Sequence, residues 1–148
     1  MYREILLPTD GSEAARLATR HAIDLAEQYG SRLHALFVVD SAAYAALETG
    51  AQPVIEAITE EGRRATARIE AEAADAGIDA ESAVETGSPH RRIVEYAAEH
   101  DIDLIVMATH GRTGLDRYLL GSVTERVVRT ADCPVLTVGV TAEPAAAE

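Results

Sequence analysis

Apolar residues recur along this chain in two alternating patterns. Short, almost continuously apolar runs alternate with longer segments in which apolar side chains return every three or four residues. Continuous runs are typical of strands covered on both faces, and the longer spacing is typical of helices with one buried side. The pattern predicts five strands, at 4–9, 32–39, 79–86, 103–109 and 134–140. It predicts four helices between them, at 12–29, 53–76, 89–100 and 122–131.

This order of elements favours an open, doubly wound α/β sheet, because parallel strands need helical crossovers that pack on both faces. The chain has 148 residues, without an internal repeat or a domain linker. We therefore expect one domain over residues 1–140, followed by a disordered tail at 141–148. Glu81 and Glu85 place charges in the third predicted strand, which suits the edge of a sheet.

The helical stripe of the first predicted helix includes His21, which we therefore expect to be packed and hydrogen-bonded. The inward positions of this stripe are Ala14, Leu17, Ala18, His21, Ala22, Leu25 and Ala26. The other histidines are scattered along the sequence and do not predict a metal site. The single cysteine, Cys133, stands beside an apolar run and predicts a buried structural thiol.

Candidate ligand contacts follow the strands, because open parallel sheets bind ligands beyond the carboxyl ends of their strands. After the fourth predicted strand, Gly111 allows close approach of the main chain to an anion. Gly121 and Ser122 open a helix whose free N–H groups favour negative charge, and the hydroxyls of Ser122 and Thr124 add donors. The segment from Ser122 to Glu125 also fits a capping box that would satisfy the same amides, so both interpretations stay open.

Two further residues near the predicted strand ends have alternative interpretations. Asp10 suits a turn between strand and helix, and equally a contact to a base amino group or a metal. His110 faces either solvent or a ligand. The chain contains no lysine, which excludes a Walker loop, and no Gly-x-Gly-x-x-Gly motif follows the first strand. Few aromatic residues are available to stack on a flavin.

The charge of the chain argues against some partners. The formal net charge is −12, and all 13 basic residues are arginine. Such an acidic surface repels nucleic acids and anionic membranes, and it suggests adaptation to high salt, where self-repulsion is screened. A genome that favours arginine codons is the alternative explanation. No apolar run is long enough to span a membrane, and the first residues do not resemble a signal peptide, so we expect a cytoplasmic protein.

Three segments resemble the universal stress protein family, and the likeness covers residues 2–140. The segments are Ile5–Ser12, Phe37–Asp40, and Met107–Gly114 with the following Leu120–Glu125. ATP-binding members carry Gly, two residues, Gly, nine residues, and then Gly with Ser or Thr. Here nine residues separate Gly111 from Gly121-Ser122, but Ala108 stands at the first glycine and adds a Cβ where the main chain would approach ribose or phosphate.

The resemblance implies the strand order 3-2-1-4-5 and a site for ATP, with or without Mg²⁺ or Mn²⁺. By this resemblance the adenine would be framed by Pro8, Thr9, Asp10 and Val38. The ribose would lie along Met107 and Ala108, and the phosphates would be held by Gly111, Gly121, Ser122, Val123 and Thr124. The family also pairs its fifth strand across a two-fold axis, which implies a homodimer through Val135 to Val140.

We therefore expect a stress-response regulatory protein that binds an adenine nucleotide and is not an efficient enzyme, because no residue set supplies an activated nucleophile. One alternative is a weak ATPase or phosphotransferase, with Asp10 holding metal and His110 near the terminal phosphate. Another alternative is an interaction module that has lost nucleotide because of Ala108.

Overall fold

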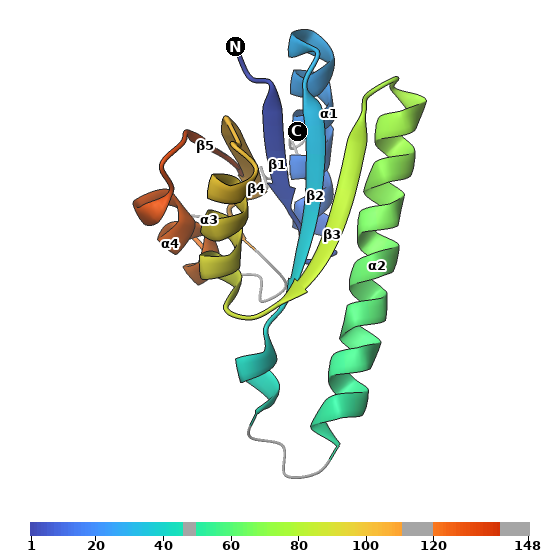
Figure 1. The fold of residues 1–148 in the computed structure, drawn as a ribbon, viewed down its shortest axis with the longest axis vertical. Helices are drawn as coiled ribbons and strands as arrows, with labels where there is room; N and C mark the ends of the chain where they lie inside the picture. The colour runs from blue at the N-terminus through green and yellow to red at the C-terminus, as the bar shows by residue number, and fades with distance from the viewer. Residues whose placement is uncertain (46–49, 111–119, 140–148) are drawn as a thin grey trace, which may run out of the picture.

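Parallel strands form one sheet with helices on both of its faces (Figure 1). The structure is a computed structural model, which describes residues 1–45, 50–110 and 120–139. The strands are β1 Glu4–Pro8, β2 Arg32–Val39, β3 Ala80–Thr86, β4 Leu104–Ala108 and β5 Val135–Val138. The helices are α1 Glu13–Tyr29, the 3-10 helix η1 Ser41–Tyr44, α2 Ala51–Asp75, α3 Pro89–Glu99 and α4 Ser122–Thr130.

The strand order β3-β2-β1-β4-β5 confirms the order that the family resemblance implies. Central strand β1 pairs in parallel with β2 and β4, so that Leu6 lies opposite both His34 and Ile105. The acidic third strand lies at the edge, as its charges predict. The tail predicted at 141–148 lies outside the described residues.

The central strand shows why its sequence is continuously apolar. Ile5 and Leu7 face the layer of α1 and α2, whereas Leu6 faces the layer of α3 and α4. All three side chains are fully buried. Because both faces of the sheet are covered, the three central positions of β1 are all apolar, and the period-two alternation disappears there.

Helix α1 buries most of the predicted stripe, but His21 is an exception. Ser12 caps the helix by accepting a hydrogen bond from the Ala15 amide (3.2 Å), and Gly30 ends it with φ 65°. The buried positions are Ala15, Ala18, Thr19, Ala22 and Ala26. The expectation that His21 is packed is wrong, since His21 is exposed.

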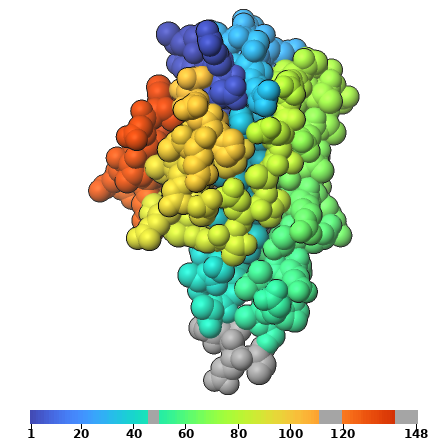
Figure 2. Space-filling view, viewed as in Figure 1, coloured from blue at the N-terminus to red at the C-terminus, as the bar shows by residue number. Residues whose placement is uncertain are grey.

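Helix α2 approaches the sheet closely at a glycine. A Cβ on Gly62 would lie 2.5 Å from Cδ1 of Phe37, so only glycine lets the helix pass at this distance. The helix begins at Ala51, two residues before the predicted start. Its first turns and η1 extend beyond the carboxyl end of the sheet (Figures 1 and 2). These two elements therefore reach the region where ligands bind in such sheets.

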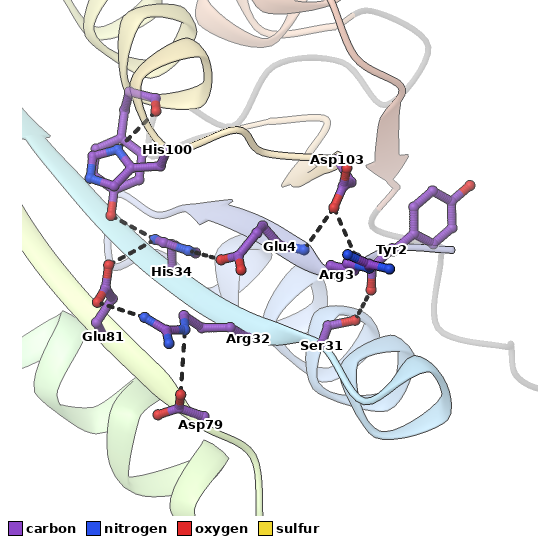
Figure 3. A network of polar contacts seen from close by, with 11 residues as sticks. Tyr2, Arg3, Glu4, Ser31, Arg32, His34, Asp79, Glu81, His100 and Asp103 are labelled. Atoms are coloured by element: carbon purple, nitrogen blue, oxygen red, sulfur yellow. Dashed lines mark hydrogen bonds and ion pairs between the residues drawn. The ribbon is translucent and has the colours of Figure 1, made fainter.

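A polar network fills the space beneath α3 at the amino end of the sheet (Figure 3). The buried His34 places Nε2 2.7 Å from Oε1 of Glu4, and its Nδ1 lies 2.8 Å from the Tyr96 hydroxyl and 3.2 Å from Oε2 of Glu81. The ring of His100 stacks on Tyr96 with centroids 3.8 Å apart. The fold thus brings together His34 and His100, which are scattered along the sequence, so that their rings lie 5.5 Å apart.

Candidate functional site

A pocket of about 450 Å³ lies at the carboxyl ends of β1, β2 and β4. Its volume falls within the usual range of small-molecule sites. All the described residues that the sequence proposed as nucleotide contacts line it, namely Pro8, Thr9, Asp10, Val38, Met107, Ala108, Gly121, Ser122, Val123 and Thr124. Gly111 lies outside the described residues. The fold therefore gathers candidates from three separate segments into one concavity.

The turn between β1 and α1 forms one wall of the pocket. Asp10 accepts a hydrogen bond from the Ser12 amide at Oδ1 (2.9 Å), and the hydroxyl oxygen of Thr9 accepts from the Gly11 amide (3.0 Å). Gly11 adopts φ 80°, which favours glycine. Asp10 thus fulfils its predicted turn role and also lines the pocket, while contact with a ligand stays a prediction.

The N-terminus of α4 forms the opposite wall. Gly121 is the N-cap residue, and within the described part of the chain no side chain caps this helix. Glu125 pairs with Arg129 (3.0 Å) instead of reaching back, so the alternative of a capping box is wrong. The first-turn amides and the positive end of the helix dipole therefore open into the pocket, and no side chain among the described residues accepts from these amides.

Thr124 and Ala108, both expected to contact the nucleotide, also have structural roles in the fold. The buried Thr124 donates its hydroxyl proton to the carbonyl oxygen of Ala108 (2.8 Å), which ties α4 to the end of β4. A phosphate could therefore use the Thr124 amide but not its hydroxyl proton. Ala108 belongs to the core cluster beneath α1, so the methyl group that replaces the family's glycine has a place in the core.

His110 is buried and lines the pocket, with Nδ1 3.0 Å from the Thr109 hydroxyl. The interpretation of a solvent-facing histidine is therefore wrong. A direct contact between His110 and a ligand stays a prediction. Among the described residues, no cluster of three metal-ligating side chains is present, here or elsewhere.

Sequence reasoning missed the residues that extend the pocket beyond the strand ends. Tyr44 of η1 and Ile58 of α2 line it on the side of β2, and Pro89 and Ile93 of α3 line it on the other face of the sheet. Tyr44 stands in the loop after the second predicted strand, and only this position could have indicated that it lines the pocket. No feature of the sequence indicated that Ile58 lines the pocket. It does so because α2 is long enough to extend past the carboxyl end of the sheet.

Comparison with known proteins identifies the family. The model of the universal stress protein family matches residues 1–139. The universal stress protein MJ0531 of Methanocaldococcus jannaschii is 40% identical over 140 residues, which span 93% of this chain and 82% of that protein. The chain belongs to the universal stress protein family.

Solved structures agree with the fold of this universal stress protein. The structure of MJ0577, also from Methanocaldococcus jannaschii, has a TM-score of 0.84 at 35% identity and covers 93% of this chain and 96% of its own. A universal stress protein in complex with cAMP has a TM-score of 0.65 at 28% identity, with 93% and 96% of the two chains covered. Among the described residues, no helix of this universal stress protein is long and apolar enough to cross a membrane.

Proposed function

We propose that this universal stress protein binds an adenine nucleotide, ATP in the first place, and acts as a regulatory protein in the stress response. The observation that carries the proposal is the N-terminus of α4, which no described side chain caps and which opens into the same pocket as the β1–α1 turn. Such helix ends bind phosphate through main-chain amides and the helix dipole. The relative in complex with cAMP supports an adenine ring as the other part of the ligand.

In this proposal the phosphates lie at Gly121, Ser122 and Val123, and Thr124 contributes its amide. The adenine lies between the segment 8–10 and Val38, and the ribose lies along Met107 and Ala108. Since the described residues contain no ready metal cluster, Mg²⁺ or Mn²⁺ would enter together with the phosphates and be held chiefly by them.

Two variants of Ser122 test the role of the main chain. Proline suits the first position of a helix, and the extended conformation of Gly121 (ψ 155°) suits a residue before proline. Ser122→Pro therefore removes one amide donor without breaking α4, whereas Ser122→Ala removes only the hydroxyl. By calorimetry we expect Ser122→Pro to weaken ATP binding about 10- to 100-fold, since a hydrogen bond to a charged group contributes about 1.5–3 kcal/mol. We expect a smaller loss for Ser122→Ala.

Unchanged ATP affinity in Ser122→Pro would reject this phosphate position. A wild-type protein that binds neither ATP nor cAMP would reject the nucleotide function itself. Greater affinity for cAMP than for ATP would show that the ligand is a cyclic nucleotide.

We further propose that bound ATP is a regulatory ligand and is not turned over efficiently. Asp10, the carboxylate beside the expected base, already accepts a hydrogen bond from the main chain in its turn. Phosphate release from ATP, measured over hours with and without Mg²⁺, should stay close to the uncatalysed rate. Steady release that Asp10→Ala abolishes would favour the weak ATPase instead.

The edge strand β5 supports a proposed homodimer. Leu136 of β5 is 37% exposed and Val128 of α4 is 44% exposed, and an apolar sheet edge invites pairing with a second copy. Leu136→Glu should yield a monomer in light scattering at micromolar concentration, whereas Tyr29→Glu, at an exposed position on α1, should leave the dimer intact. A monomeric wild type would contradict this proposal.

The charge of the chain supports a protein adapted to high salt. With a net charge of −12 and no lysine, self-repulsion destabilises the compact state until salt screens it. The melting temperature should therefore rise between low and molar salt. A constant melting temperature would favour arginine codon usage as the explanation.

A further inference from the structure

The pocket has an aromatic wall that none of the expected nucleotide contacts uses. Tyr44 of η1 lines the pocket beside Phe37 of β2 and Ile58 of α2. Within the described part of the chain, Tyr44 is half-buried, makes no hydrogen bond or ring contact, and belongs to no core cluster. The structural core therefore does not explain this side chain, and its ring is available to a ligand.

The sheet topology separates this wall from the helix terminus that would hold phosphate. The chain enters η1 directly after β2, whereas α4 adjoins the end of β4, to which Thr124 is hydrogen-bonded. Since β1 lies between β2 and β4, the two walls are about two strand spacings, or roughly 10 Å, apart. A ligand that touches both walls is consequently elongated, with different chemistry at its two ends.

The charges of the pocket orient such a ligand. Asp40 lines it at the end of β2, where its carboxylate repels an anion. The positive end of the α4 dipole attracts one. The anionic part of the ligand therefore lies at α4, and an uncharged, flat, apolar part with polar edges suits the side of Tyr44.

We propose that Tyr44 is a specificity-determining residue that stacks on the nucleobase and selects nucleoside phosphates over other phosphorylated compounds. This inference rests on the proposed nucleotide function and adds to it. Stacking on an aromatic ring accepts any base, because every base has a π face. Tyr44 thus distinguishes a nucleotide from a sugar phosphate or an inorganic polyphosphate, and it contributes little to the choice among bases.

The first test separates the base from the phosphates by calorimetry with ATP, adenosine and tripolyphosphate. Tyr44→Ala should weaken the binding of ATP and adenosine about 5- to 100-fold and leave the affinity for tripolyphosphate unchanged. Tyr44→Phe keeps the ring and should retain wild-type affinity for all three. Tyr29→Ala, which removes an exposed tyrosine from α1, is the matched control and should bind like the wild type.

A second, spectroscopic test detects the stacked ring itself. The chain has five tyrosines and no tryptophan, so its ultraviolet fluorescence comes from tyrosine. ATP should quench part of this fluorescence in the wild type, and Tyr44→Phe should lose that quenching while it still binds ATP.

Wild-type ATP affinity in Tyr44→Ala, or full quenching in Tyr44→Phe, would overturn this inference and leave the proposed function intact. An equal loss of tripolyphosphate binding in Tyr44→Ala would also overturn it, because the substitution would then disturb the whole pocket. Failure of the wild type to bind ATP would overturn both proposals.

Discussion

The two ends of the sheet differ in whether their polar groups have side-chain partners. At the amino end, His34 contacts Glu4, Glu81 and Tyr96, and Asp103 accepts hydrogen bonds from two main-chain amides at 2.9 Å each. At the carboxyl end, no described side chain caps α4, and its first turn opens into a pocket. Polar groups that satisfy one another stabilise the fold, whereas donors left without a side-chain acceptor can bind a ligand. We therefore interpret the amino end as structural and keep the carboxyl end as the proposed functional site.

The largest expected effect is a loss of stability when the polar network at the amino end of the sheet is disrupted. His34→Ala removes a buried ring and leaves the Tyr96 hydroxyl without its partner, so the free energy of unfolding should fall by about 2–4 kcal/mol. Urea denaturation measures this loss, and the exposed His21→Ala is the control. The folded variant should retain its ATP affinity. A change below about 0.5 kcal/mol, the size expected at a surface position, would show that the network does not stabilise the fold.

Alkaline pH should lower the free energy of unfolding, because Tyr96 at the amino end of the sheet then loses its proton. Burial, followed by the charges of Glu81, Glu85 and Glu4, raises the pKa of Tyr96 to about 12, from an ordinary value of 10.0. A folded-state pKa above the unfolded value means that this stability is fully present below pH 10 and is lost as the pH rises through 12. The loss should approach about 2–3 kcal/mol.

Unfolding free energies between pH 9 and 12 measure this dependence. Tyr96→Phe should be less stable at pH 9, because it lacks the contact with His34, but its stability should fall less steeply with pH. Equal slopes in the two proteins would contradict the assignment to Tyr96.

A smaller loss of stability is expected at the carboxyl end, from a substitution of Ala108. Ala108→Gly removes a methyl group from the core beneath α1 and adds backbone freedom, so stability should fall by about 1 kcal/mol. ATP affinity, measured by calorimetry, should not change, because the methyl group packs in the core. A marked gain in affinity would show that the alanine hinders the ribose or phosphates.

The smallest effect concerns Cys133, which precedes β5. The thiol is half-buried and not fully buried as the sequence predicted. This partial burial, and then the charges of Asp103 and Asp132, raise the pKa of the thiol, so little reactive thiolate forms at neutral pH. Labelling with a disulfide reagent should be slow at pH 7 and should accelerate on unfolding in urea. Cys133→Ser should abolish labelling, and rapid labelling of the folded protein would reject a structural thiol.

Local patterns in the sequence predicted most of the fold, because apolar runs and helical spacing report burial directly. The runs at Ile5–Leu7 and Leu104–Ala108 are buried strands of the sheet. The same patterns misplaced His21, which directly precedes the buried Ala22, because neighbouring positions on a helix face directions about 100° apart. They also missed the contact of His34 with Tyr96, whose positions are 62 residues apart in the chain.

The sequence by itself determined the strands and helices, the family, and the residues that line the pocket at the ends of β1 and β4. Tertiary structure alone decided which amides stay uncapped, where the Ala108 methyl group packs, and that Tyr44 and Ile58 border the same pocket. The physical reason is that strand and helix preferences depend on neighbouring residues. Hydrogen-bond satisfaction and pocket walls depend instead on groups that only the folded sheet brings together.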